Sequence, residues 1–223
     1  MANDIAMEIK QMLEEAWNEF KAYYDKKAPE YSEKWNGQRG NPQEDHWICW
    51  DEHDLCFQVG RFFYDKLNKR KEEDEDFSDI EIHFEKKLDT VNFGKYEFKD
   101  KLDILMQILK EKFGIKKGPK IDLMISHESS NGSFLLCAEV KCFRTSVSYD
   151  EVNKDIEKLR IIKREKIADE AVFMVFDDYY HCRSRNKEIP KKIKDKLEEA
   201  KRDKEILVLS GDSKAKLRQY QNK

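Results

Sequence analysis

Residues 119 to 141 constrain the fold of this chain more than any other stretch. They hold two apolar runs, 121–125 and 134–142, separated by a polar turn that contains Ser-Ser-Asn-Gly-Ser. Apolar runs of this length, bounded by turn residues, predict two strands that are covered on both faces. The stretch therefore predicts two central strands of a sheet.

Both predicted strands carry charged residues inside an apolar run. Asp122 interrupts the first run, and Glu139 and Lys141 lie on either side of Val140 in the second. Side chains of a strand alternate between its faces, so Glu139 and Lys141 project from the same face, about 7 Å apart. Charges in an apolar layer are costly unless they are paired or bind a metal. We therefore predict a divalent-cation site, and the alternative is a structural Glu139–Lys141 ion pair on the sheet surface.

The rest of the chain predicts helices and strands around this stretch. Helices are expected over 4–25, from about residue 42 or 51 to residue 67, and over 97–113, 148–166 and 190–204. Further strands are expected over 80–85, 171–176 and 205–209. Residues 69–79 are mostly charged and predict a mobile linker. In 80–85 the apolar and polar residues alternate, which predicts a half-buried strand with His83 and Glu85 in solvent, unless that face borders the site.

Composition bounds the compartment and the charge distribution. The chain has 223 residues and a net charge of −3, but residues 183–223 hold fourteen Lys and Arg against seven Asp and Glu, which leaves −10 for residues 1–182. An acidic body with a basic end is compatible with local phosphate contacts. Five cysteines without a paired pattern, no apolar leader and no apolar run near about 18 residues predict a reduced, cytoplasmic protein with no membrane partner.

One carboxylate falls on the apolar face of a predicted helix. Glu52 lies three residues before Leu55 and seven before Val59, so helical spacing places all three on one stripe. Glu52 could favour the helix dipole at the helix start, or it could reach the predicted cation site.

The order of these residues is similar to that of a known family. Asp122, a gap of sixteen residues and Glu139-Val140-Lys141 resemble the signature of the PD-(D/E)XK nucleases, which have a restriction-endonuclease-like fold. The predicted order of elements over about residues 50–176 resembles their αβββαβ core, with 97–113 as an insertion and 4–25 as an extra N-terminal helix. The resemblance implies an α/β protein with a central mixed sheet flanked by helices. Pro119 lies three residues before Asp122 instead of directly before it, which departs from the signature. The resulting division is 1–41 as N-terminal helix and loop, 42–210 as nuclease-like domain and 211–223 as polar tail.

The resemblance implies a metal-dependent nuclease. In that family the aspartate and the glutamate bind Mg²⁺ or Mn²⁺, and the lysine positions or activates the attacking water. The matching catalytic residues here are Asp122, Glu139 and Lys141, with Glu52 as an accessory ligand, and the implied metal site comprises Asp122, Glu139, Val140 and Glu52. We expect an endonuclease that hydrolyses phosphodiester bonds of DNA rather than RNA, in restriction or mobile-element defence. The alternative is a catalytically inactive nuclease fold that binds nucleic acid or a protein partner.

The acidic body restricts where a nucleic acid could lie. Phosphates require cationic side chains, and two segments supply them: the helix after Glu-x-Lys and the loop after the fourth strand. The expected contacts are Lys154, Lys158, Arg160, Arg183 and Arg185, with Tyr179 and Tyr180 stacking on bases. The three helix side chains are expected to point outward or sideways. The amphipathic helix over 4–25 either packs on the body or forms a homodimer face.

Overall fold

The structure is a computed structural model, and it describes residues 2–35, 51–88, 96–114, 119–127, 133–143, 148–177 and 189–212. In the first and third helices the side chains are described over 4–27 and from residue 100 onward. The elements in chain order are α1 (Ala2–Trp35), α2 (Glu52–Glu73), the short 3₁₀ helix η2 (Glu75–Phe77), β1 (Ile80–Lys87), α3 (Tyr96–Phe113), β2 (Lys120–His127), β3 (Phe134–Cys142), α4 (Tyr149–Arg164), β4 (Ala168–Asp177), α5 (Lys191–Arg202) and β5 (Leu207–Asp212).

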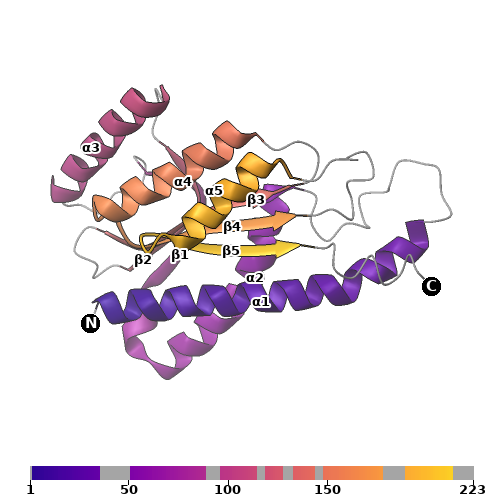
Figure 1. Ribbon diagram of the computed structural model, residues 1–223. Coiled ribbons are helices and arrows are strands. Elements are labelled where there is room, and N and C mark those ends of the chain that lie inside the picture. Colours follow the sequence, from indigo (N-terminus) through magenta and orange to yellow (C-terminus); the bar gives the residue numbers. More distant parts are fainter. Residues whose placement is uncertain are drawn as a thin grey trace.

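A five-stranded mixed sheet lies at the centre, with helices on its two faces (Figure 1). The strands follow the order β1-β2-β3-β4-β5. The pairs β1–β2 and β2–β3 are antiparallel, whereas β3–β4 and β4–β5 are parallel. Parallel neighbours need a crossover connection, and α4 and α5 lie in the two crossovers. The protein is therefore α/β, as the sequence predicted.

The sheet separates two apolar cores. Buried residues of α1 and α2, among them Trp17 and Phe63, pack on the face that carries Leu136, Ala138 and Val140 of β3. Buried residues of α3, α4 and α5 pack on the opposite face, which carries Cys137. Because side chains alternate along β3, Glu139 and Lys141 project toward the α4 face.

Several predicted elements are confirmed. The strand predicted over 134–142 is β3, with the same limits, and the first seven of its residues are buried. The helix predicted from residue 148 is α4, whose N-cap Ser148 accepts a hydrogen bond from the amide of Glu151 at 3.4 Å. Gly114 ends α3 with a φ of +66°, a conformation that glycine adopts without strain.

The predicted linker over 69–79 is wrong, because its charged residues serve local contacts. Helix α2 continues to Glu73, and η2 follows directly. Arg70 pairs with Asp74 one turn later and lies over the ring of the buried Phe77, 4.7 Å from its centroid. Lys71 donates to two backbone carbonyls beyond η2. The charged run 69–79 is therefore held in place by local contacts, among them that of Arg70 with the ring of Phe77.

The predicted alternation in β1 is also wrong in part. Ile80 is buried, but His83 is buried as well and exchanges a 2.9 Å hydrogen bond with Ser126 of β2. Phe84 remains 44% exposed, although it packs against α2 at Gly60, where an added Cβ would lie 2.8 Å from the ring. His83, on the polar face of β1, is therefore covered. Phe84, the last apolar residue of the strand, lies at the edge of the contact with α2.

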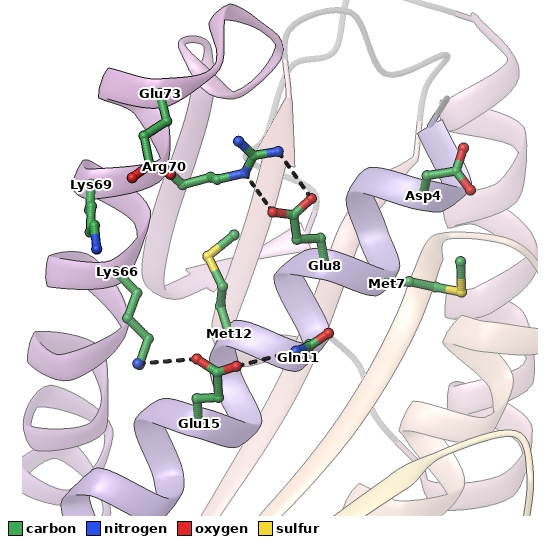
Figure 2. A pocket seen from close by; sticks show the side chains of 10 residues that line it. All are labelled: Asp4, Met7, Glu8, Gln11, Met12, Glu15, Lys66, Lys69, Arg70 and Glu73. Carbon is green, nitrogen blue, oxygen red and sulfur yellow. Dashed lines mark hydrogen bonds and ion pairs between the residues drawn. The ribbon is translucent and has the colours of Figure 1, made fainter.

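Helices α1 and α2 lie side by side and enclose a hollow between them (Figure 2). Arg70 of α2 pairs with Glu8 of α1, and Lys66 pairs with Glu15 and Glu19. Figure 2 shows Met12 pointing between the two helices at the centre of the hollow.

Among the described residues, no helix is long and apolar enough to span a membrane.

Candidate active site

The centre of the candidate site is a carboxylate pair on neighbouring strands. Leu123 of β2 lies opposite Ala138 of β3, so the next position of the antiparallel register brings Asp122 to the level of Glu139. Asp122 Oδ2 accepts a hydrogen bond from the backbone amide of Val140 at 2.8 Å. The structure therefore brings together the three strand residues that the sequence placed in one metal site.

Helix α4 adds two further charged residues to this pair. Asp155 and Lys158 are three residues apart, and therefore share one face of the helix. Lys158 Nζ lies 2.5 Å from Glu139 Oε1 and 3.1 Å from Asp155 Oδ1, and it donates to the backbone carbonyl of Lys120 at 3.1 Å. Lys158 is thus a buried counter-ion of the glutamate.

Lys141 connects the cluster to α2. Its Nζ lies 3.0 Å from Asp155 Oδ2 and 3.1 Å from Glu52 Oε2. Glu52 is the first residue of α2, which is capped by Asp51 through hydrogen bonds from the amides of His53 and Asp54. The cap fixes the helix start, and with it the position of Glu52 at the rim of the cluster, where its side chain is 41% exposed.

Burial dominates the electrostatics of Glu139. Burial raises the pKa of its carboxyl well above the usual range, Lys158 opposes that increase, and Asp155 and Asp122 reinforce it. Burial also raises the pKa of Glu52, which Lys141 lowers in part. For Asp155 burial acts in the same direction, but Lys158 and Lys141 outweigh it, so its pKa is lowered.

Both lysines keep their charge despite burial. Desolvation alone would lower the pKa of each ammonium group, but the neighbouring carboxylates raise it above the usual value, through Asp155 and Glu52 for Lys141 and through Glu139 and Asp155 for Lys158. Lysines that stay charged inside a cluster of carboxylates can orient water or phosphate oxygens, but cannot themselves bind a cation.

One oxygen of the cluster is left without a hydrogen bond. Glu139 Oε1 is buried, and although it lies at ion-pair distance from Lys158, that contact lacks the geometry of a hydrogen bond. Carboxylate oxygens are the type of ligand that hard divalent cations such as Mg²⁺ and Mn²⁺ prefer. In the part of the chain that the structure describes, no three His, Cys, Asp or Glu side chains are grouped closely enough to hold a metal ion, and the two ammonium groups pair with the carboxylates.

The thiol of Cys56 contacts the pair from the opposite side of β2. Its Sγ lies 3.7 Å from the backbone carbonyl of Asp122, and burial raises its pKa to about 12. A thiol with so high a pKa stays protonated near neutral pH and is a poor nucleophile. Cys56 therefore supports the backbone of Asp122, and the chemistry of the cluster rests on its carboxylates and lysines.

The expected outward or sideways orientation is wrong for Lys158, whereas Arg160 lies sideways against α5. Lys158 is buried against Glu139, and Arg160 is held by Glu157, Glu199 and Asp203. Neither side chain points into solvent, because acidic groups of the fold neutralise both.

Of the other expected nucleic-acid contacts, Lys154 alone lies within the described residues. Lys154 is half-buried on α4. Arg183, Arg185, Tyr179 and Tyr180 lie outside the described residues.

Asp155 is the site residue that sequence reasoning missed. It lies three residues after Val152 and four before Leu159, on the stripe of α4 that the sequence predicts as buried. The same spacing argument singled out Glu52 on α2. A carboxylate on a buried helix stripe directly after Glu-x-Lys was therefore the available signal.

The hollow between α1 and α2 contains none of the clustered residues. Its lining consists of Asp4, Met7, Glu8, Gln11, Met12, Glu15, Lys66, Lys69, Arg70 and Glu73 (Figure 2). Its charged side chains of both signs pair across the helices, which is typical of a helix–helix contact.

Comparison of the chain with protein-family models, with curated proteins and with solved structures gave no match.

Proposed function

We propose that this protein is a metal-dependent nuclease that hydrolyses phosphodiester bonds of DNA. The observation that carries the proposal is the placement of Asp122, Glu139 and Lys141, which come from neighbouring strands and lie around one buried cluster. These are the positions of the acid and of Glu-x-Lys in the PD-(D/E)XK signature.

The arrangement of elements supports the same proposal. Helix α2, strands β1 to β3, helix α4 and strand β4 follow the order αβββαβ, and α3 interrupts that order between β1 and β2. Strands β1, β2 and β3 form an antiparallel meander, and α4 leads to β4 in parallel with β3. This sheet resembles the restriction-endonuclease-like core, with α1 as the extra N-terminal helix.

The proposed cation is Mg²⁺ or Mn²⁺, and Asp122 and Glu139 are its main ligands. The proposed site also includes Val140, and Glu52 is an accessory ligand. When bound, such an ion lowers the pKa of a coordinated water and neutralises charge that develops on the phosphate. Asp155 and Glu52 hold the Lys141 ammonium at the rim of the cluster, where it can orient that water or support the phosphate. Asp155 acts through Lys141 and is therefore a positioning residue.

A second candidate function is a nuclease fold without catalysis that binds nucleic acid or a protein partner. One observation favours it: each of the two lysines of the cluster already contacts two carboxylates. Such pairing can serve the fold alone. The presence of Asp122, Glu139 and Lys141 together favours the catalytic candidate, since ion pairs that only stabilise the fold do not require these three residues at these positions.

The test is incubation of the purified protein with linear, circular and single-stranded DNA and with RNA, each in Mg²⁺, Mn²⁺ or EDTA. The nuclease proposal expects DNA cleavage in Mg²⁺ or Mn²⁺, abolished by EDTA and by Asp122→Asn. Cleavage of circular DNA identifies an endonuclease. Binding of DNA without cleavage under any of these conditions would instead support the non-catalytic candidate, and cleavage that Asp122→Asn retains would indicate a contaminating enzyme.

A further inference from the structure

The formal charges of the cluster leave an imbalance. Two ammonium groups pair with three carboxylates, those of Glu52, Glu139 and Asp155, and the carboxylate of Asp122 lies beside Glu139. With all four carboxylates ionised, the excess is two negative charges, which one divalent cation would neutralise. Buried charges without compensation are costly, so the cluster is electrostatically suited to one further dication.

The two lysines have different positions relative to the central carboxylate pair. Among the described residues, the ion pairs of Lys141 are with Glu52 and Asp155. Lys158 contacts Glu139 itself, at the buried oxygen that has no hydrogen bond. A cation that binds Glu139 would therefore meet Lys158 first, and two positive charges cannot share that oxygen at close range.

Lys158 also has other partners toward which it can move. Besides Glu139 it contacts Asp155 Oδ1 and the backbone carbonyl of Lys120, both at 3.1 Å. A lysine carries its charge on a flexible four-carbon chain with three donors, so a small rotation can release one partner and keep the other two.

We propose that Lys158 is an internal counter-ion that occupies the cation-binding carboxylate of the metal-free protein, and that a divalent cation displaces it from Glu139 onto Asp155 and the Lys120 carbonyl. The inference rests on the cation site of the proposed function. It makes Lys158 a determinant of cation affinity, instead of the phosphate contact that the sequence suggested. The ammonium group stabilises Glu139 when no cation is bound, and competes with the cation for it.

The test compares Mn²⁺ binding by calorimetry in the wild type, Lys158→Met and Lys141→Met. Both variants remove one positive charge from the cluster, so a general charge effect tightens Mn²⁺ binding equally in the two. Displacement predicts a Kd about tenfold lower in Lys158→Met than in Lys141→Met, because only Lys158 competes for Glu139. Equal affinities of the two variants, or weaker binding by Lys158→Met, would overturn the inference.

Thermal melting supplies a second readout with the same proteins. Without a cation, Lys158→Met leaves Glu139 uncompensated and should lower the Tm. Saturating Mn²⁺ should then raise the Tm of Lys158→Met more than that of the wild type, since ligand stabilisation grows with affinity. An equal increase in both proteins would contradict displacement.

A wild-type measurement covers the case in which Lys158→Met does not fold. Nitrogen-15 NMR of the lysine ammonium groups, during titration with Mg²⁺, should show the Lys158 signal shift while that of Lys163, on the same helix but paired with Glu170, stays constant. An unchanged Lys158 signal at saturating Mg²⁺ overturns the inference. Absence of cation binding in every variant overturns both this inference and the metal site, whereas displacement without nucleic-acid cleavage supports the inference and overturns only the proposed activity.

Discussion

Asp155 Oδ2 lies 3.0 Å from Lys141 Nζ, and its other oxygen lies 3.1 Å from Lys158 Nζ. One carboxylate of α4 therefore holds both lysines of the cluster. Its burial and the two ammonium groups act against each other, and the ammonium groups prevail, so that its pKa is lowered. Asp155 is thus the ionised centre of the network, although it is not a proposed metal ligand.

Asp155→Asn should reduce cleavage by about 10- to 100-fold, because residues that orient functional groups have effects of this size, and it should weaken Mn²⁺ binding less than Asp122→Asn does, because Asp155 is not a proposed ligand. The loss should lie in kcat rather than KM, since Lys141 would be less well positioned. Steady-state kinetics and calorimetry check this. Asp150→Asn, on the first turn of α4, is the matched control and should behave as the wild type. A purely structural role of Asp155 would lower the Tm and leave kcat unchanged.

Asp122→Asn and Glu139→Gln should each abolish cleavage and weaken Mn²⁺ binding by at least about 100-fold, since each removes an anionic oxygen ligand. Both substitutions preserve side-chain shape, and the amide introduced by Asp122→Asn would retain an oxygen acceptor for the backbone N–H of Val140. Circular dichroism should show a native fold for both variants. Cation affinity that is unchanged in both would refute their assignment as ligands.

Lys141→Met should lower kcat by about 100- to 1000-fold without weakening Mn²⁺ binding, because the lost group acts on charge in the transition state. Mn²⁺ should bind at least as tightly as in the wild type, since the surrounding carboxylates lose one counter-ion. Single-turnover cleavage and calorimetry measure the two effects separately. Turnover at the wild-type rate would exclude a catalytic role for Lys141.

His83 should make stability depend on pH. Burial, and then the neighbouring Lys86, lowers its pKa, which Glu81 opposes in part, while Ser126 of β2 occupies Nε2. The unfolded chain therefore binds the proton at a higher pH than the folded one, so stability falls as the pH drops below about 6.5.

Urea unfolding between about pH 7.5 and 5.5 measures this slope. His83→Gln, which can still donate to Ser126, should flatten it. An identical slope in His83→Gln and the wild type would show that this histidine does not contribute.

The strands β3 and β4 could be predicted because most of their residues are apolar. In β3 the run 134–142 had one interpretation, and the two charges inside it pointed to the cluster directly. Asp122 and Glu139 could be paired because neighbouring antiparallel strands leave few registers. The order of the elements, read along the sequence, completed the outline of the fold.

The partners of the charged residues could not be predicted in the same way. Lys158 was interpreted as a phosphate contact because nothing in its neighbourhood along the chain shows that Glu139, nineteen residues earlier, lies beneath it. The partners of Arg160 were missed for the same reason, since Glu199 and Asp203 lie some forty residues later. The run 69–79 looked mobile because the contact of Arg70 with Phe77 depends on how the chain turns after α2. Ion pairs between distant segments leave little trace in local patterns.

The two apolar cores lie on opposite faces of the sheet and have no side chains in common, yet Lys141 joins α2 on one face to α4 on the other through Glu52 and Asp155. If either helix separated from the sheet, a buried charge on the half that remains folded would lose its partner. The two halves of the molecule should consequently unfold in one cooperative transition. The ionic contacts at the end of β3 couple the unfolding of one half to that of the other.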